Sequence, residues 1–204
     1  TKPKHIFFIV GESIPQWSLD ETHKLLNICP GLWNFKSQSH TVQIPNFLPA
    51  GNVSRPSIVS LMSGIYDAGL EINERESFWK GVFPTSFAHQ MKRLGYQTIY
   101  WYGGNASYGN FNHFGKAQGF DRVESASIFC GPDAPKTWVG VYDHVFLENI
   151  EQQIKSINEP TFHFIYTTSN HGPYKMEDSL LDYDPEKVMP DVGEDLRSNK
   201  TRNK

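Results

Sequence analysis

The stretch His5–Val10, with the sequence HIFFIV, is continuously apolar and is followed by Gly11. Short apolar runs of this kind are typical of strands that lie buried in a parallel sheet. Two later runs share this character, Tyr96–Tyr102 (YQTIYWY) and Phe162–Thr167 (FHFIYT). The sequence therefore predicts at least three buried strands.

Segments with helical spacing separate these strands. Apolar residues recur at helical intervals over residues 58–65, where Pro56 suits the first turn, and over residues 87–94, where Gly95 suits the end. A long amphipathic helix is predicted over residues 141–157. Strands that alternate with helices predict an α/β fold, in which a mainly parallel sheet is flanked by helices.

Three other segments carry weaker patterns. Residues 25–35 are amphipathic, and residues 40–47 alternate enough to predict a strand. Residues 175–204 are polar and weakly periodic, which predicts a long loop or a mobile end.

The bulk composition excludes some classes of function. With 204 residues, of which 38% are hydrophobic, the chain is long enough for one domain with a real core. A net charge of −3, without a basic stripe, argues against a nucleic-acid partner. No apolar run approaches the roughly 20 residues that cross a bilayer, so we expect any membrane span outside this sequence.

The two cysteines, Cys29 and Cys130, are far apart and lack the spacing of a metal site. Two unrelated thiols are favoured over a long-range disulfide, which would need an oxidising compartment.

Candidate functional residues follow the predicted strands. Ligands of open α/β sheets bind beyond the carboxyl ends of the strands, which here are followed by residues 11–13, 103–105 and 169–171. Glu12 is a carboxylate directly after a buried strand, and such a group must be solvated, paired or bound to a cation. Taken alone, Glu12 suits a structural anchor at least as well as a metal ligand.

Ser54 precedes the predicted helix at residues 58–65, within the sequence GNVSRPS. Serine is a common helix N-cap, and taken alone that role is favoured. The same position also suits a nucleophile, because the N-terminus of a helix favours a phosphate or sulfate group. A divalent cation would stabilise the alkoxide of such a serine.

Two loops offer further polar groups. His171 follows the third predicted strand, where it suits a ligand about as well as ordinary polar surface. The glycine-rich segment after Tyr102 offers hydrogen-bonding groups at Asn105, Tyr108 and Asn110, although a tight turn would explain it equally well. No Gly-x-Ser-x-Gly elbow is present, which argues against an α/β-hydrolase triad.

Four segments, in this order, resemble motifs of the sulfatase-like branch of the alkaline phosphatase superfamily. They are Ile6–Ser13, Val53–Gly64, Tyr96–Asp121 and Ser169–Tyr174. The likeness is greatest to the extracytoplasmic domains of lipoteichoic acid synthases and related phosphoglycerol or phosphoethanolamine transferases. It implies an alkaline phosphatase-like fold, with residues 1–174 as the N-terminal part of a catalytic domain and residues 175–204 as the end of an incomplete one.

The resemblance implies a role for each matching residue. Glu12 would bind one divalent metal ion (Mn, Mg, Zn or Ca), and Ser54 would be the nucleophile and would touch the same ion. The transferases usually carry threonine in place of this serine. His171 would bind the phosphate-linked group of the substrate or a second metal. Gly109 and Phe111 stand where the glycerol-phosphate transferases carry Trp and Arg, which argues against that specificity.

The sulfatase alternative depends on the segment from Ser54 to Ile58. Sulfatases oxidise the first residue of a Cys/Ser-x-Pro-x-Arg segment to formylglycine, and Ile58 here replaces the closing arginine. Unmodified serine and phosphoryl transfer are therefore favoured over a sulfatase in which Ser54 is modified. A non-catalytic relative that serves as a binding module is a further alternative.

The resemblance also implies metal ligands outside this sequence. The family completes its metal site with an adjacent Asp-His pair after a later strand. The pair Asp143-His144 lies instead in the predicted helix at residues 141–157, where we interpret it as solvated surface. We expect a domain truncated at its C-terminus, which by itself binds metal poorly and has little activity.

The resemblance thus implies transfer of a phosphoalcohol group, through a phospho-serine, from a phospholipid donor to an envelope glycan or lipid acceptor. It places the protein at the cell membrane, held by segments outside this sequence, with this domain periplasmic or extracellular.

Overall fold

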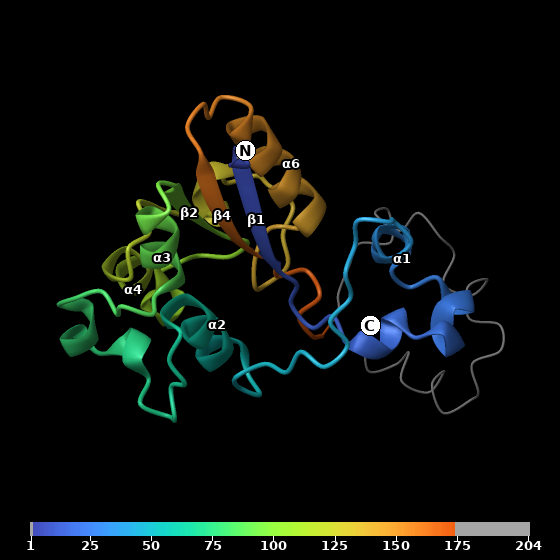
Figure 1. Ribbon diagram of the computed structural model, residues 1–204, viewed down its shortest axis with the longest axis horizontal. Coiled ribbons are helices and arrows are strands. Elements are labelled where there is room, and N and C mark those ends of the chain that lie inside the picture. The colour runs from blue at the N-terminus through green and yellow to red at the C-terminus, as the bar shows by residue number, and fades with distance from the viewer. Residues whose placement is uncertain (1, 174–204) are drawn as a thin grey trace. The chain divides into compact units, whose positions relative to one another are not determined.

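A computed structural model describes residues 2–173 of the chain, and Figure 1 shows its ribbon. The chain divides into two compact units. The first combines Thr1–Glu12 with Pro49–Ser169, and the second combines Ser13–Leu48 with Asn170–Lys204. The predicted loop at residues 175–204 lies outside the described residues.

The first unit is built on a four-stranded sheet with the strand order β1-β4-β2-β3. The strands are β1 (His5–Val10), β2 (Gln97–Tyr102), β3 (Arg122–Ser125) and β4 (Thr161–Tyr166). All three pairings are parallel, so the prediction of a mainly parallel sheet is confirmed. β3 was not predicted, because its four residues, RVES, form no apolar run.

The helices of the first unit include the three that the sequence predicts. They are α2 (Ser54–Ser63), α3 (Phe87–Arg93), α4 (Phe111–Ala117), α5 (Ala126–Phe129) and α6 (Asp143–Ile154), with the 3-10 helices η3 (Ile72–Glu74), η4 (Glu76–Trp79) and η5 (Tyr108–Asn110). α2 ends two residues earlier than its apolar pattern, because Gly64 adopts a left-handed φ of 69°.

Each face of the sheet packs against its own apolar cluster. Tyr100 and Phe164 belong to the cluster that includes α2, α3 and α4, whereas Trp101 and Ile165 belong to the cluster that includes α6. In Figure 1, α6 accordingly lies on one side of the strands and α3 on the other. This arrangement follows from the alternation of side chains along each strand.

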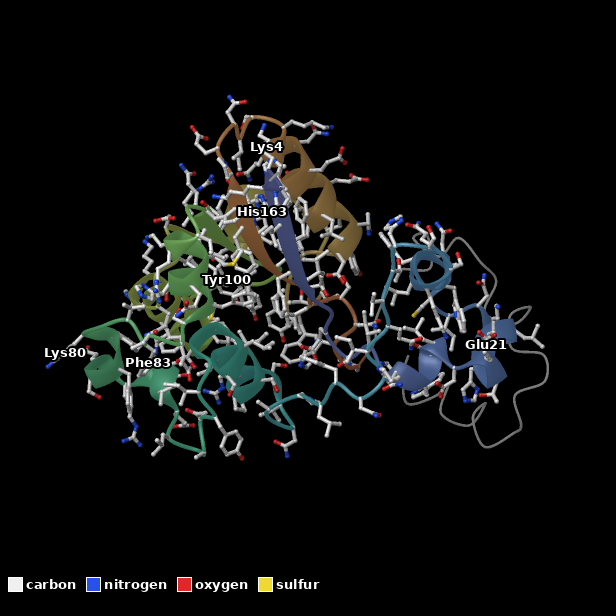
Figure 2. All side chains as sticks on the ribbon, in the orientation of Figure 1. Lys4, Glu21, Lys80, Phe83, Tyr100 and His163 are labelled. Carbon is white, nitrogen blue, oxygen red and sulfur yellow. The ribbon has the colours of Figure 1, made fainter. Side chains whose placement is uncertain are left out.

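His163 of β4 is fully buried on the α6 face (Figure 2). Trp101 Nε1 donates a hydrogen bond to His163 Nδ1 at 3.1 Å, and His163 Nε2 lies 3.1 Å from His5 Nδ1. Phe7 stacks on the same imidazole at 4.9 Å. Burial, with the nearby His5 and Arg122, lowers the pKa of His163 to about 4. His163 is therefore a neutral core residue at physiological pH.

The second unit contains η1 (Gln16–Leu19), η2 (Glu21–Leu26) and α1 (Pro30–Lys36). The strand predicted at residues 40–47 is wrong, since this segment has no regular structure and Val42 and Phe47 are 85% and 67% exposed. Alternating side chains make a strand only where another strand pairs with it, and within the described part of the chain none does.

Two further properties can be read from the described residues. None of their helices is long and apolar enough to cross a membrane. Cys29 and Cys130 are both free thiols.

Candidate active site

Ser54 is the first residue of α2, and its hydroxyl does not cap the helix. The N-cap residue is Val53, in extended conformation with φ −138°, and no side chain there bonds the helix. Ser54 Oγ instead donates a hydrogen bond to Glu12 Oε2 at 3.0 Å. The two residues that the sequence singled out therefore meet, although they are 42 positions apart.

Glu12 is held at the carboxyl edge of the sheet by the last residue of β4, Tyr166, and by the residue after it, Thr167. Tyr166 donates its hydroxyl hydrogen to the same oxygen, Glu12 Oε2. The backbone N–H of Glu12 donates to Thr167 Oγ1 at 3.3 Å. These contacts arise because β1 and β4 pair in register, with Val10 opposite Tyr166. The site thus presents one carboxylate oxygen to two hydroxyl groups.

Tyr166 is a site residue that the sequence analysis missed. It ends β4, and its ring stacks on Tyr102 of β2 at 5.3 Å. Burial, and then the hydrogen bond to Glu12, raises the pKa of the Tyr166 hydroxyl, and burial also raises that of Tyr102. Both phenols keep their protons at neutral pH, so Tyr166 acts as a donor and not as a base. Its register opposite Val10 is a property of the folded sheet, and no local pattern in the sequence pointed to it.

The predicted substrate loop is tied largely to protein groups. Asn105 Oδ1 accepts hydrogen bonds from the N–H of Ser107 at 3.0 Å and from its hydroxyl at 2.8 Å. Asn110 Nδ2 donates to Glu74 Oε2. Tyr108 is half-exposed and lies under the Arg55 guanidinium, with 5.8 Å to the ring centroid. Asn105 and Asn110 therefore shape the loop, and their role toward a substrate stays a prediction.

Arg55 and Glu74 connect this loop to the start of α2. Arg55 Nη1 donates to Glu74 Oε1 at 2.9 Å, and this hydrogen bond raises the pKa of the guanidinium. Asn73 Nδ2 donates to the carbonyl of Gly109 at 2.6 Å. Gly109 has a φ of 58°, and Phe111 is buried in the core. The two positions that resemble substrate-binding ones in transferases are thus a tight turn and a core residue.

Asp143 is not the solvated surface residue that we predicted. Its Oδ1 accepts hydrogen bonds from the N–H groups of Thr168 at 2.9 Å and Ser169 at 3.1 Å. Its own N–H donates to Ser169 Oγ at 2.7 Å. This carboxylate at the start of α6 therefore anchors the loop after β4. His144, in contrast, is exposed as predicted.

Backbone segments approach very closely beside this anchor. A Cβ atom on Gly140 would lie 2.3 Å from the carbonyl oxygen of Gly103 and 2.5 Å from Thr168 Oγ1. A Cβ atom on Gly103 would lie 2.9 Å from the same Thr168 oxygen. The N–H of Val141 donates to Gly103 O at 2.9 Å, which fixes the approach. Only glycine fits at these two positions without movement of the backbone.

His171 belongs to the second unit, whereas Glu12 and Ser54 belong to the first. Its Nδ1 donates to the carbonyl of Gly172 at 2.7 Å. Its predicted role as a substrate or metal ligand stays a prediction.

The side chains of Glu12 and Ser54 partly fit a divalent cation. Carboxylate and hydroxyl oxygens suit hard cations such as Mg²⁺ and Ca²⁺, which take about six to eight oxygen ligands. Among residues 2–173, no group of three or more His, Cys, Asp or Glu is arranged to hold a metal ion. The expectation that ligands outside this sequence complete the metal site stays a prediction.

Comparisons with known proteins agree with this architecture. The Sulfatase family model matches residues 4–199. A solved structure of an alkaline phosphatase superfamily protein from Vibrio parahaemolyticus has a TM-score of 0.72 at 23% identity, covering 92% of this chain and 46% of its own. The lipoteichoic acid synthase LtaP from Listeria monocytogenes gives 0.56 at 19% identity, with coverages of 73% and 35%.

A third solved structure is the C-terminal periplasmic domain of EcEptC from Escherichia coli. It has a TM-score of 0.59 at 17% identity, covering 100% of this chain and 55% of its own. At these identities the likeness concerns the fold, and it bears out the predicted alkaline phosphatase-like architecture. The chain spans between about a third and about half of the length of the three structures.

Proposed function

This chain belongs to the Sulfatase family, in the alkaline phosphatase superfamily, and on that premise we propose that its protein transfers a phosphoalcohol group. The donor is a phospholipid, the acceptor is an envelope glycan or lipid, and the group is phosphoglycerol or phosphoethanolamine. The observation that carries the proposal is the hydrogen bond from Ser54 to Glu12 at the N-terminus of α2. A serine hydroxyl held by a carboxylate at a helix N-terminus is suited to attack on phosphorus.

In the first half-reaction, Ser54 Oγ forms a bond to phosphorus while the bond from phosphorus to the lipid alcohol breaks. The lipid alcohol departs with the electron pair of the broken bond and takes up one proton, which balances the proton that the Ser54 hydroxyl loses. Glu12 orients the Ser54 hydroxyl through its hydrogen bond. The N–H groups of the first turn favour the phosphoryl oxygens, and Pro56 removes one of these donors.

In the second half-reaction, the oxygen of the acceptor hydroxyl forms a bond to phosphorus while the bond from phosphorus to Ser54 Oγ breaks. The proton that the acceptor hydroxyl loses balances the proton that Ser54 regains. Tyr166 keeps its proton and its hydrogen bond to Glu12, so the carboxylate stays oriented throughout. When bound, a divalent cation held by Glu12 and Ser54 would supply positive charge that favours the alkoxide.

The fold neighbours support the proposed setting. One is a lipoteichoic acid synthase and another is a periplasmic domain. The proposed location is accordingly the outer side of the cell membrane.

The nucleophile is tested in the full-length protein with a labelled phospholipid. We expect Ser54→Ala to abolish turnover. We also expect it to abolish the label that the wild-type protein carries on the peptide containing residue 54. Ser60→Ala is a matched control in the same helix, because the Ser60 hydroxyl is buried without a hydrogen-bond partner. Wild-type turnover by Ser54→Ala would rule out Ser54 as the nucleophile.

The sulfatase alternative makes a different chemical prediction for the same residue. Ile58, which replaces the arginine of the modification segment, is buried in the core. Mass spectrometry of the purified protein is expected to find unmodified serine at position 54, or its phosphoryl adduct. If formylglycine is found at that position and the protein releases sulfate from a sulfate ester, the function is sulfate-ester hydrolysis and not phosphoryl transfer.

A further inference from the structure

A pocket of about 310 Å³ lies between the two segments that flank α2 in the chain. One wall comes from residues 50–53 with Arg55 and Pro56, and the other from residues 66–69 with Glu71 and Asn73. Pockets of this volume are at the small end of those that hold organic ligands. Neither Glu12 nor Ser54 lines it, so it is a feature separate from their hydrogen bond.

Both walls of the pocket are fixed by hydrogen bonds. Ser57 Oγ donates to the carbonyl of Gly51 at 2.8 Å, which holds the first wall against the helix. On the second wall, the buried carboxylate of Asp67 accepts from the N–H groups of Glu71 at 3.1 Å and Ile72 at 2.9 Å. The pocket is therefore formed before a ligand enters, which reduces the entropy cost of binding.

The second wall also holds an uncommon backbone. Ala68 and Glu71 are non-glycine residues with left-handed φ values of 49° and 51°. Such residues persist only where the surroundings hold them, and they are concentrated at functional sites. Here the Asp67 carboxylate holds the far end of the turn at Glu71 and Ile72, and Glu71 lines the pocket.

The charges around the pocket favour a cation. Its lining includes two carboxylates, Asp67 and Glu71, and one guanidinium, Arg55. The charge of Arg55 is offset by Glu74 at 2.9 Å. An excess of one sign of charge attracts ligands of the opposite sign, and this lining carries two negative side chains and one positive one.

The pocket is also adjacent to the proposed nucleophile. Val53 and Arg55 both line it, and Ser54 lies between them in the chain. Because consecutive Cα atoms are about 3.8 Å apart, the lining of the pocket begins one residue from Ser54 on either side.

We propose that this pocket binds the alcohol end of the transferred group and selects a small alcohol that carries an ammonium ion, with Glu71 as its counter-charge. The link to Ser54 rests on the proposed function. The preference of the pocket for an ammonium ion does not, and it can be measured separately.

The first experiment measures binding to the full-length protein without any reaction. Ethanolamine and glycerol are titrated separately and followed by saturation-transfer NMR. We expect ethanolamine to bind more tightly than glycerol. Glu71→Gln should weaken ethanolamine binding about fivefold, the size of one exposed charge pair, and should leave glycerol unchanged.

Glu76→Gln is the matched control, because Glu76 is exposed in η4 and does not line the pocket. It is expected to leave both affinities unchanged. Glycerol binding as tight as ethanolamine binding, or an unchanged ethanolamine affinity in Glu71→Gln, would overturn the proposal.

The second experiment compares phosphatidylethanolamine with phosphatidylglycerol as donors. Glu71→Gln is expected to lower kcat/KM for the first about fivefold relative to the second. An equal loss for both lipids contradicts selection by Glu71. If the protein transfers from neither lipid, the proposed function fails, and the binding experiment still decides the role of the pocket.

Discussion

Two polar clusters lie three residues apart on β4, and they differ in almost every physical respect. Tyr166 joins Glu12 and Ser54 at the carboxyl edge of the sheet, where the carboxylate and the serine are only partly buried. His163 joins His5 and Trp101 within the sheet and is fully buried. The histidine looks more like a catalytic group by residue type, yet only the carboxylate cluster is open to a substrate. Position on the sheet therefore separates a candidate site from a core network better than residue type does.

The largest expected effect falls on the carboxylate cluster. Glu12→Gln keeps the shape of the side chain and removes its charge, so transfer should fall on the order of a hundred- to a thousandfold. The free energy of unfolding should change by about 1 kcal/mol or less, since neutral hydrogen bonds to the amide oxygen remain.

The measurements are turnover with a labelled phospholipid and a denaturant melt, both on the full-length protein. Titration with Mn²⁺, Mg²⁺ and Zn²⁺ adds a test of the predicted metal role, for which Glu12→Gln should weaken binding. If Glu12→Gln leaves both turnover and metal affinity unchanged, Glu12 is a structural anchor. The carboxylate cluster would then be structural, as the histidine cluster is.

The histidine cluster should instead govern the dependence of stability on pH. Above pH 6.5 the imidazole of His163 is neutral in both the folded and the unfolded chain, and its contribution is constant. Below that pH the unfolded chain binds a proton that the folded chain excludes until about pH 4. Stability is therefore expected to fall by about 1.4 kcal/mol for each pH unit in this window.

Equilibrium unfolding at a series of pH values checks this slope. The groups that influence His163 are His5, whose own pKa burial lowers, and Arg122. His163→Phe should flatten the curve between pH 6.5 and about 4. A slope that survives this substitution would assign the effect to other groups.

Removal of the imidazole should cost stability and spare activity. His163→Phe leaves Trp101 Nε1 without its acceptor, which costs about 1–3 kcal/mol at pH 7. The double variant His163→Phe with Trp101→Phe should recover part of this loss, because neither buried partner is then left unsatisfied. Turnover that falls with His163→Phe by more than the loss of folded protein would show that the two clusters communicate.

The smallest expected effect concerns the residue that connects β4 to the site. Tyr166→Phe removes one donor to Glu12 but keeps the stacked ring, so stability should fall by about 1 kcal/mol and turnover by about tenfold or less. Kinetics and a thermal melt on the same preparation measure both. A loss of turnover as large as that of Glu12→Gln would make Tyr166 a catalytic group and not an orienting one.

The sequence predicted those parts of the fold in which a local pattern coincides with burial. The apolar runs of β1, β2 and β4 and the spacing of α2 and α3 were sufficient to locate these elements. The prediction that all three strands are buried is wrong for β1, an edge strand in which Phe7 is 50% and Ile9 is 59% exposed. β3 escaped prediction because four mixed residues carry no period. Residues 40–47 have the alternating pattern of a strand but no partner strand among the described residues. Pairing between strands depends on the tertiary structure, so a short stretch of sequence cannot predict it.

The residues of the candidate site also differ in whether a local pattern predicts them. Glu12 and Ser54 could be predicted, because each lies at the end of a recognisable element. Tyr166 and Asp143 could not, because their roles depend on register and on the meeting of distant loops. The order of the motifs, rather than any one residue, favoured the functional interpretation of Glu12 and Ser54.

The close approach of Gly103, Gly140 and Thr168 has a consequence for anyone who wishes to alter this protein. Three loops share one volume there, and even a methyl group would displace them. Insertions or larger side chains at this junction would shift the base of the β4 loop and the start of α6 together. Efforts to change specificity should therefore leave the junction untouched and vary the other side chains of the turn after α2, while keeping Gly69, whose φ of 78° strains any other residue.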